Sequence, residues 1–452
     1  MKQMLQVVRG FVLLAMVIPA VAQTEGDFTY TNDGSAITIT RYSAKALGGV
    51  VIVPREIAGL PVRAIGEFAF ADRPAITSVT LPDTVTNIGK IGFGLCTGLT
   101  NIVIPNGVVG IGGSAFQYCY LLPAISLPSS VVAIGEKAFS ECTNLAAITV
   151  ADGNPAFRSS AGVLFNQDGT RLIQAPGGIH GEYVIPEGVT AIEAWACFGS
   201  PWLTRVSIPG SVTNIGSRSL QSCPRLAAID VRAPNPEYYS VDGVLFKSVH
   251  ALMQFPQGRL EPSYTTPPSA TAIEYRAFSD CTNLTSIAFA DAMSFLGDAA
   301  FAYCTGLTSV RMGKGVAVIG GATFAHCTNL TRICFEGAAP GGIGPGSFFG
   351  VPATVYYLPG TAGWEPTFAG LPTAPWLPTL ENQDARYGLS SNRFSFTIMW
   401  ARDRVVTVEA AASLTSPVWT PVATITLVHG LADFDDSAWS GSPSQYYRVR
   451  SP

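Results

Sequence analysis

Apolar positions recur along this chain with a period of 23 residues. Cysteine marks the period in two series of three, at Cys96, Cys119 and Cys142 and at Cys281, Cys304 and Cys327. A fixed period of this length indicates a stacked repeat protein, in which each repeat forms one coil. Nine segments fit the same frame: 58–80, 81–103, 104–126, 127–149, 185–207, 208–230, 266–288, 289–311 and 312–334.

Within a repeat, three apolar segments predict the parts of one coil. Residues 99–105 follow the pattern L-x-x-I-x-[LI]-P and end at Pro105, which is typical of a short strand because proline cannot continue a β-ladder. Residues 131–135 predict a second short strand that ends at the turn glycine Gly135. Residues 138–145 carry apolar side chains three apart, which favours a single turn of α-helix or 3₁₀-helix.

One such coil cannot bury its apolar side chains alone, so neighbouring coils must cover one another. The repeat places phenylalanine above phenylalanine, as in Phe116 and Phe139 or in Phe278, Phe301 and Phe324. We therefore predict a mainly β solenoid with short strands, single helical or 3₁₀ turns and a continuous core.

The repeated motif I-G-x-x-A-F-x-x-C-x-x-L-x-x-I-x-[LI]-P resembles the BspA-like leucine-rich repeats, also called the Treponema pallidum type. The resemblance covers about residues 28–376. It implies a curved leucine-rich repeat solenoid of a bacterial surface or secreted protein. For some members of that family it also implies adhesion to host or matrix proteins.

Two related insertions interrupt the nine repeats, near residues 150–184 and 231–265. Residues 154–165 and 235–246 share the pattern N-P-x-[FY] followed by G-V-L-F. Each insertion predicts a longer coil that contains a β-hairpin. Because insertions in solenoids gather on one face, they can form a binding site, or they can merely extend the coil.

The repeat at 185–207 departs from the motif, because Cys197 takes the phenylalanine position and Ser200 the cysteine position. We expect the nearby Trp195, Phe198 and Trp202 to fill the lost core volume. The alternative is that these rings form an aromatic platform for a ligand.

The N-terminal residues 1–22 predict a secretory signal peptide. Lys2 and Arg9 form its positive region, residues 10–18 its apolar region, and residues 20–22 a small-residue cleavage site. A transmembrane anchor is the alternative, but the apolar region is shorter than the roughly 20 residues that a membrane-spanning helix needs. We expect an exported chain with no transmembrane segment after cleavage, located outside the cell or on its surface, with the periplasm as an alternative.

The ends of the mature chain differ from the repeats. Residues 23–57 predict an N-terminal cap, and residues 335–380 a C-terminal capping coil followed by a proline-rich arm. Residues 381–452 predict a small antiparallel β-sandwich-like domain, with strand-like runs at 394–398, 405–408, 422–425 and 446–449. The last run is similar to the aromatic-Tyr-Arg-hydrophobic end of C-terminal tail domains in secreted proteins of Verrucomicrobia-like bacteria, which leaves sorting, surface attachment and glycan binding open.

Composition narrows the functional class. Apolar residues make up 48% and charged residues 13%, so the chain is too apolar to be disordered. A net charge of −4 offers no basic surface for nucleic acid, and no run of Lys or Arg indicates an anionic membrane surface.

We find no motif for catalysis, phosphate binding or dinucleotide binding, and the four histidines are scattered. We therefore expect neither an enzyme nor a cofactor nor a metal site. Asp433, Asp435 and Asp436 form an acidic cluster without the full spacing of a calcium loop, so a solvated turn is favoured over a calcium site.

These features favour an exported binding or adhesion protein that recognises an extracellular protein or polysaccharide. The alternative is a structural scaffold of the envelope or extracellular matrix, attached through the C-terminal domain. Candidate ligand-binding residues are the variable strand positions and two tryptophans: Asn101, Arg205, Asp230, Arg311, Arg332, Trp195 and Trp202.

The cysteines predict a measurable property. Seven of the nine occupy one repeat position inside an apolar run. Adjacent coils, about 4.8 Å apart, are close enough for disulfides, but cysteine fills small core spaces well and an odd count leaves one thiol free. We expect a buried, reduced ladder, so thiol titration of the unfolded protein without reductant should count close to nine. A count of about five or fewer would contradict it.

Overall fold

The computed structural model describes residues 23–43, 49–381, 388–390, 393–401, 403–428, 430–436 and 446–451. These residues form strands and turns without any helix, and hence no helix suited to cross a membrane. The predicted signal peptide lies outside the described residues. The chain divides into two compact units, Met1–Leu203 with Ser211–Cys223, and Thr204–Gly210 with Pro224–Pro452.

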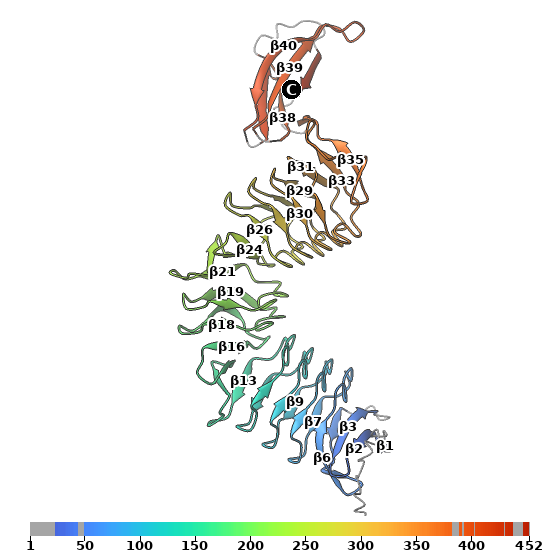
Figure 1. The fold of residues 1–452 in the computed structure, drawn as a ribbon, viewed down its shortest axis with the longest axis vertical. Coiled ribbons are helices and arrows are strands. Elements are labelled where there is room, and N and C mark those ends of the chain that lie inside the picture. Colours follow the sequence, from blue (N-terminus) through green and yellow to red (C-terminus); the bar gives the residue numbers. More distant parts are fainter. Residues whose placement is uncertain are drawn as a thin grey trace, which may run out of the picture. The chain divides into compact units, whose positions relative to one another are not determined.

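In the first unit, most coils contribute one short strand to each of two parallel series (Figure 1). The register steps by one repeat, as in Ser78 opposite Asn101 and Gly110 opposite Ala133. The first series comprises β1 (Gln23–Glu25), β2 (Phe28–Asn32), β3 (Ile37–Tyr42), β6 (Leu60–Ile65), β8 (Asn87–Ile88), β10 (Gly110–Ile111) and β12 (Ala133–Ile134), with β5 (Glu56–Ile57) beside β6. In this series β1, β2 and β3 pair antiparallel, as do β5 and β6, and the strands from β3 through β6 to β12 pair parallel. The second comprises β4 (Val50–Ile52), β7 (Ser78–Thr80) and β9 (Asn101–Val103), then the pair β11 (Ala124–Leu127) and β13 (Ala147–Val150).

The first insertion forms the predicted β-hairpin. Ala161 and Gly162 join its two strands with φ angles of 49° and 78°, as a type I′ turn requires. The carbonyl of Gly162 accepts a hydrogen bond from the N–H of Ile148 at 2.8 Å, so the turn covers the open edge of β13. The hairpin strands belong to a five-stranded sheet of their own. It contains β14 (Phe157–Ser160), β15 (Val163–Asn166), β16 (Arg171–Gln174), β18 (Ala191–Ile192) and β20 (Asn214–Ile215). Strand β17 (Gly181–Val184) follows β16 in the chain.

The second unit repeats this arrangement. The carbonyl of Gly243 in the second hairpin accepts a hydrogen bond from Ile229 N–H at 2.8 Å. One sheet contains β22 (Tyr238–Val241), β23 (Val244–Lys247), β24 (Ala251–Gln254), β26 (Ala272–Ile273), β28 (Phe295–Leu296), β30 (Val318–Ile319) and β32 (Gly342–Ile343). The other contains β25 (Ser263–Thr265), β27 (Ser286–Ala288), β29 (Ser309–Met312), β31 (Arg332–Phe335), β33 (Thr354–Tyr357), β35 (Leu371–Pro375) and β34 (Thr367–Phe368), while β19 (Leu203–Ile208) pairs with β21 (Ala228–Val231).

The predicted antiparallel C-terminal domain is confirmed as two sheets around one core. One sheet contains β36 (Thr379–Glu381), β37 (Gly388–Ser390), β38 (Arg393–Met399) and β41 (Leu431–Asp436), and the other contains β39 (Val405–Ala411), β40 (Thr420–Thr426) and β42 (Tyr446–Arg450). Their core shares one hydrophobic cluster with Cys334, Leu358 and Trp376 of the preceding segments. The indole N–H of Trp400 donates to the carbonyl of Trp376 at 2.7 Å, so this domain is not joined by a bare linker.

The solvated turn expected at Asp433, Asp435 and Asp436 is wrong, because all three residues lie in strand β41. Asp433 accepts a hydrogen bond from the Thr397 hydroxyl at 2.6 Å, and Asp436 accepts one from the Tyr447 hydroxyl. Two of the three aspartates therefore bond to side chains of neighbouring strands of this domain, and the short D-F-D-D segment forms a strand instead of a turn.

The predicted helical turn is also wrong. In the segment predicted as a helical turn, backbone N–H groups alternate between partners in the same coil and in the next coil. Gly92 N–H donates to Gly89 O at 3.1 Å, whereas Phe93 N–H donates to Ala115 O at 2.8 Å. Two residues per coil have left-handed backbone, here Ile91 at φ 55° and Leu95 at φ 62°. A right-handed helix cannot contain such residues, so the apolar spacing belongs to consecutive turns.

The predicted phenylalanine column forms the core. Ring centroids lie 4.9 Å apart between Phe70 and Phe93, 5.4 Å between Phe93 and Phe116, and 5.6 Å between Phe116 and Phe139. All four rings are completely buried. Each coil therefore supplies one face of its neighbour's core, which is why no single repeat is stable alone.

The cysteine column lies beside the phenylalanines. All nine cysteines are buried and none forms a disulfide. The thiol of Cys142 donates to the carbonyl of Phe116 in the preceding coil at 3.0 Å, and Cys304 does the same to Phe278 at 3.0 Å. Burial raises the pKa of Cys142 to about 12, so the thiol stays protonated and keeps this bond at neutral pH.

Phe116→Ala should lower the free energy of unfolding by about 3–5 kcal/mol, because it opens a cavity between two flanking rings. Urea denaturation followed by circular dichroism measures the change. Phe68→Ala is the matched control, since Phe68 is 52% exposed and should cost under about 1 kcal/mol. Equal losses in the two variants would contradict the stacked core.

Candidate binding site

The side chains of left-handed residues point out of the stack and form columns along its turn edge. In the first unit, Lys137, Trp195 and Arg218 occupy equivalent positions of successive coils, with φ angles of 61°, 66° and 59°. The Lys137 ammonium lies 3.6 Å from the centroid of the Trp195 ring, and the Arg218 guanidinium lies 4.7 Å from it. Phe198 meets the same indole edge-on at 4.7 Å. A tryptophan held between two cations is a stable, half-exposed cluster.

The coil that carries Trp195 also carries Glu193 where other coils have glycine. That glycine follows the second strand, and a Cβ atom on Gly112 would lie 2.5 Å from the backbone nitrogen of Lys90 in the preceding coil. Glycine is therefore required wherever one coil stacks directly on another. Glu193 and Glu274 occupy this position in the first regular coil after each insertion, where the hairpin replaces the preceding coil.

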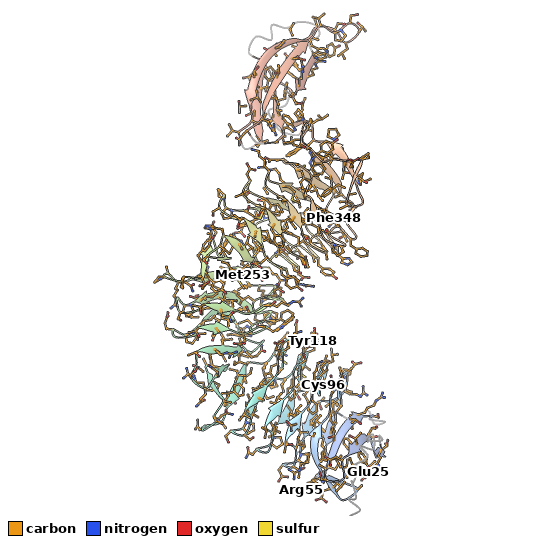
Figure 2. All side chains as sticks on the ribbon, viewed as in Figure 1. Glu25, Arg55, Cys96, Tyr118, Met253 and Phe348 are labelled. Atoms are coloured by element: carbon orange, nitrogen blue, oxygen red, sulfur yellow. The ribbon has the colours of Figure 1, made fainter. Side chains whose placement is uncertain are left out.

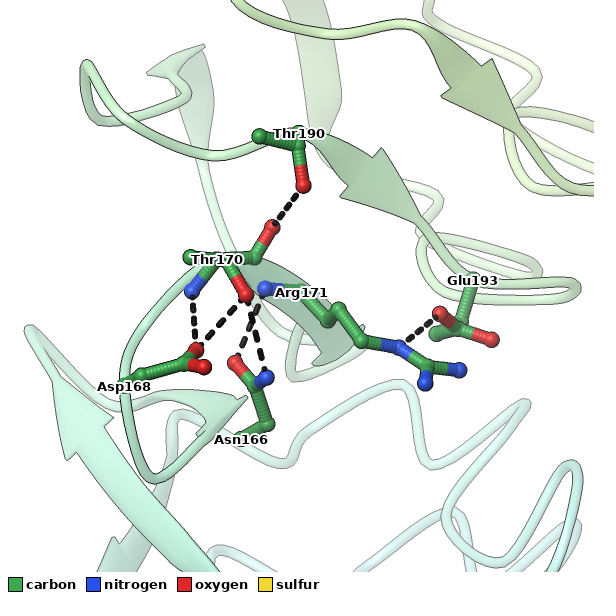
Figure 3. Close-up of polar contacts among 6 residues, drawn as sticks. All are labelled: Asn166, Asp168, Thr170, Arg171, Thr190 and Glu193. Carbon is green, nitrogen blue, oxygen red and sulfur yellow. Dashed lines mark hydrogen bonds and ion pairs between the residues drawn. The ribbon is translucent and has the colours of Figure 1, made fainter.

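The hairpin positions a partner for Glu193 (Figure 3). Asp168 accepts hydrogen bonds from the N–H and the hydroxyl of Thr170 at 2.9 and 2.6 Å, which lower the pKa of Asp168. Asn166 accepts the N–H of Arg171 at 2.8 Å. These bonds fix the start of β16, and Arg171 Nε then donates to Glu193 Oε1 at 2.8 Å.

A pocket of about 170 Å³ lies where the insertion meets the regular coils. It forms between β12 and β16, which belong to different sheets. Ile134 beside it is only partly buried, whereas the equivalent Ile111 of a directly stacked coil is 2% exposed, and Ile173 of β16 is also partly buried. The residues that line it are Ile134, Gly135, Glu136, Lys137, Ala138, Phe139, Arg171, Ile173, Gln174, Glu193 and Ala194.

The pocket combines an apolar floor with charges of both signs at its rim. Gln174 is buried and its amide donates to the carbonyls of Ala175 and Ala196 at 3.1 and 3.0 Å, so it holds the wall in place. Arg171 and Glu193 pair with each other, and their hydrogen bond raises the pKa of Arg171. The exposed Glu136 and the ammonium of Lys137 complete a rim that suits a polar ligand with an apolar part.

Three segments of the chain, residues 63–165, 181–255 and 255–354, match the model of the BspA type leucine rich repeat region, in six copies. The chain belongs to this family. The match confirms the resemblance and the repeat solenoid predicted from the sequence.

Several solved structures are similar to this BspA-type chain. A leucine rich cell surface protein from Faecalibacterium prausnitzii A2-165 is 27% identical, with a TM-score of 0.50, over 74% of this chain and 88% of that one. A leucine-rich repeat protein from Eubacterium ventriosum is 22% identical, with a TM-score of 0.42, over 72% and 93%. The T. pallidum leucine rich repeat protein is 23% identical, with a TM-score of 0.27, over 62% and 88%. A search of curated proteins gives no match.

The predicted strand residues of this BspA-type chain lie on the outward face of its parallel strands. In the first unit, the Asn101 amide donates to the Ser78 hydroxyl at 3.2 Å. In the second unit, Arg205 and Asp230 form an ion pair with each other. Arg205 and Asp230 are therefore partners within one sheet.

Two further predicted residues lie together on β29 and β31. Arg311 forms an ion pair at 3.2 Å with Glu336, which is 3% exposed, and the Arg332 guanidinium lies 4.4 Å from the Tyr356 ring centroid. Both approach Cys334, whose pKa burial raises and the two arginines lower. This group is well packed, so its arginines contribute to the sheet face as a fixed surface.

The core-filling role expected for the aromatic residues of 185–207 is wrong. Trp195, Phe198 and Trp202 are half-buried, and Trp202 stacks on His180 at 5.3 Å. The core position is occupied by the buried Cys197 itself. Trp195 also offers no open platform, because a cation covers each of its faces.

Sequence reasoning missed Lys137, Arg171 and Glu193, which the fold brings together from three separate segments. One signal for this site was present. The I-G pair of the BspA-type motif becomes I-E at Glu193 and again at Glu274, directly after each insertion. An acidic residue at a position reserved for glycine marks a coil that pairs with a strand of an insertion instead of with a regular coil.

Proposed function

We propose that this chain is an exported, non-enzymatic binding protein that attaches to an extracellular protein or polysaccharide. The family supports this role, and so does the similarity to a protein described as a leucine rich cell surface protein. The signal-like composition of residues 1–22 supports export.

The observation that carries the proposal is the pocket between β12 and β16. The regular coils are explained by packing, since their phenylalanines, cysteines and glycines serve neighbouring coils. Packing does not require the charged rim of Lys137, Arg171 and Glu193 around partly exposed isoleucines. Side chains of this kind, held by the rigid turn network at Asp168, suit recognition of a partner.

The buried thiols favour binding over thiol chemistry. Burial raises the pKa of Cys96 to about 12 and that of Cys223 to about 12, so neither supplies a thiolate at neutral pH. Their hydrogen bonds to backbone carbonyls give them a structural role instead.

An array of extracellular-matrix proteins and polysaccharides, probed with residues 23–452, tests the proposal. We expect a binder, and Lys137→Ala combined with Arg171→Ala should weaken its binding at least about tenfold, a loss of about 1.4 kcal/mol. Lys247→Ala is the matched control, because Lys247 pairs with Glu274 at 3.0 Å beside the other insertion.

Two results would contradict the proposal: no binder above background, or equal binding by the double variant and the wild-type chain. A chain that binds nothing but pellets with the cell envelope would instead support the scaffold alternative. The hydrophobic cluster that joins Trp376 to the core of the C-terminal domain suits that role, because it provides a firm attachment.

A further inference from the structure

Main-chain hydrogen bonds join each regular coil to the next along the turn edge. Ser114 N–H donates to Glu136 O in the next coil at 2.9 Å. Two residues further on, Phe116 N–H donates to Ala138 O at 2.8 Å. Tyr118, which is labelled in Figure 2, continues the series with a third bond to the same coil. A coil therefore offers N–H donors to its successor at every second residue.

The coil of residues 127–149 carries the same donors but lacks these bonds. Lys137 and Phe139 occupy the positions of Ser114 and Phe116 in the repeat, and Lys137 has the same left-handed backbone as Ser114. Within the part of the chain that the structure describes, neither main-chain N–H group donates a hydrogen bond. Two successive bonds of the ladder between coils are thus missing here.

Strand β12 of the same coil adds an unpaired acceptor. In the preceding coil, the carbonyl of Ile111 accepts a hydrogen bond from Gly135 N–H at 2.8 Å. The corresponding carbonyl of Ile134 accepts none from the described residues, and β12 pairs with no described strand except β10. We call the N–H groups of Lys137 and Phe139 together with the Ile134 carbonyl the open ladder.

The hydrogen bonds resume on the far side of β16. Ala175 N–H donates to Ala196 O at 2.7 Å, as a phenylalanine N–H does between regular coils. Glu193 N–H donates to Leu172 O at 2.9 Å, as a turn glycine does elsewhere. The missing bonds are therefore confined to the side of β16 on which the pocket lies, and Ile134, Lys137 and Phe139 all line that pocket.

Fixed contacts lie on both sides of the open ladder. The side-chain amide of Asn154 donates to the carbonyls of Pro128 and Val131 at 3.1 and 2.8 Å. On the other side, Gly178 N–H donates to the carbonyl of Leu145 at 2.9 Å. The unpaired groups are thus held within an ordered part of the stack, so little conformational freedom is lost when a ligand pairs with them.

The chemistry of the open ladder favours a peptide. Buried main-chain N–H groups without a partner are rare because each costs about as much free energy as a lost hydrogen bond, and Phe139 is completely buried. Donors two residues apart beside an acceptor match the carbonyl and N–H groups of an extended chain, as in strand addition to a sheet edge. The pocket, at about 170 Å³, is also smaller than the roughly 300–1,000 Å³ that hold whole small-molecule ligands. It suits a few residues of a longer chain.

We propose that the open ladder binds an extended peptide segment of a partner protein, which pairs with it through main-chain hydrogen bonds. The inference rests on the proposed function and selects protein over polysaccharide as the ligand of the same pocket. The main-chain bonds supply affinity, while the apolar floor at Ile134 and Ile173 receives a side chain of the segment and supplies specificity.

Amide hydrogen exchange of residues 23–452, read by mass spectrometry with residue-level fragmentation, tests the open ladder in the free chain. The amides of Lys137 and Phe139 should exchange at least about tenfold faster than those of Ser114 and Phe116, which are bonded to the next coil. Equal protection of the two pairs would overturn the inference. Protection that increases with protein concentration would also overturn it, because a second copy of the chain would then be the occupant.

An array of overlapping peptides from extracellular-matrix proteins tests the ligand. We expect at least one peptide to bind and to protect the amides of Lys137 and Phe139 from exchange. Methylating its main-chain nitrogens one at a time should weaken binding at least about tenfold at one or more positions. Ala194 lines the pocket, so Ala194→Phe should fill it and weaken binding at least about tenfold.

Ser217→Phe is the matched control, because Ser217 occupies the position of Ala194 in the next coil and is exposed. The thermal unfolding midpoint checks the fold of both variants, and the methylated peptides need no variant at all. The inference is overturned if no peptide binds, if no methylation weakens binding, or if Ser217→Phe weakens it as much as Ala194→Phe. A polysaccharide that needs Lys137 and Arg171, with no peptide bound, would overturn this inference and leave the proposed function standing.

Discussion

The direct contact of each coil with the next is the constraint on which this structure depends. A single coil buries almost nothing by itself, so its phenylalanine must meet the ring of a neighbour about one coil away. The N–H groups of left-handed residues donate across the same interface, and the cysteine thiols add a further bond there. This close approach leaves no room for a Cβ atom at the turn glycine, and the repeat length follows from closing one such coil.

The same constraint explains where the surface is free to vary. Where coils touch, every inward position is determined by packing and the glycine cannot change. Where a hairpin interrupts the stack, the glycine becomes Glu193, the core isoleucine Ile134 becomes partly exposed, and a pocket with charged walls appears. Outward positions are free for another reason, because left-handed residues project their side chains away from the core. Trp195 is one such outward residue.

Much of the architecture could be predicted from local signals. Pro105 and Gly135 end strands as expected, and Gly162 and Gly243 sit in the hairpin turns that their repeated pattern indicates. The conformation of the Ala-Phe run could not be predicted, because three-residue apolar spacing fits a helical turn and consecutive β-turns equally well. Residues such as Ile91 and Leu95, unlike glycine, gave no sign of a left-handed backbone.

The candidate site was harder to predict because its members are far apart in the chain. Lys137, Arg171 and Glu193 meet only after the hairpin takes the place of a coil, so no short motif contains them. The sequence predicts core positions for Trp195 and Trp202 because they lie close to Cys197 and Ser200, which replace the phenylalanine and cysteine of the motif. Their place in the coil, rather than their polarity, decides that they lie at the edge.

The coil-contact constraint is tested most directly by comparing an alanine substitution at a turn glycine with one at Glu193, which occupies the same position of the repeat. The free energy of unfolding should be measured by urea denaturation for Gly112→Ala and for Glu193→Ala. Gly112 has no positive φ, so only the nearby backbone of Lys90 and Gly89 excludes a methyl group. We predict a loss of at least about 2–3 kcal/mol for Gly112→Ala and of at most about 1 kcal/mol for Glu193→Ala. Equal, small losses at both positions would contradict the account, because they would mean that the coils are not held in direct contact.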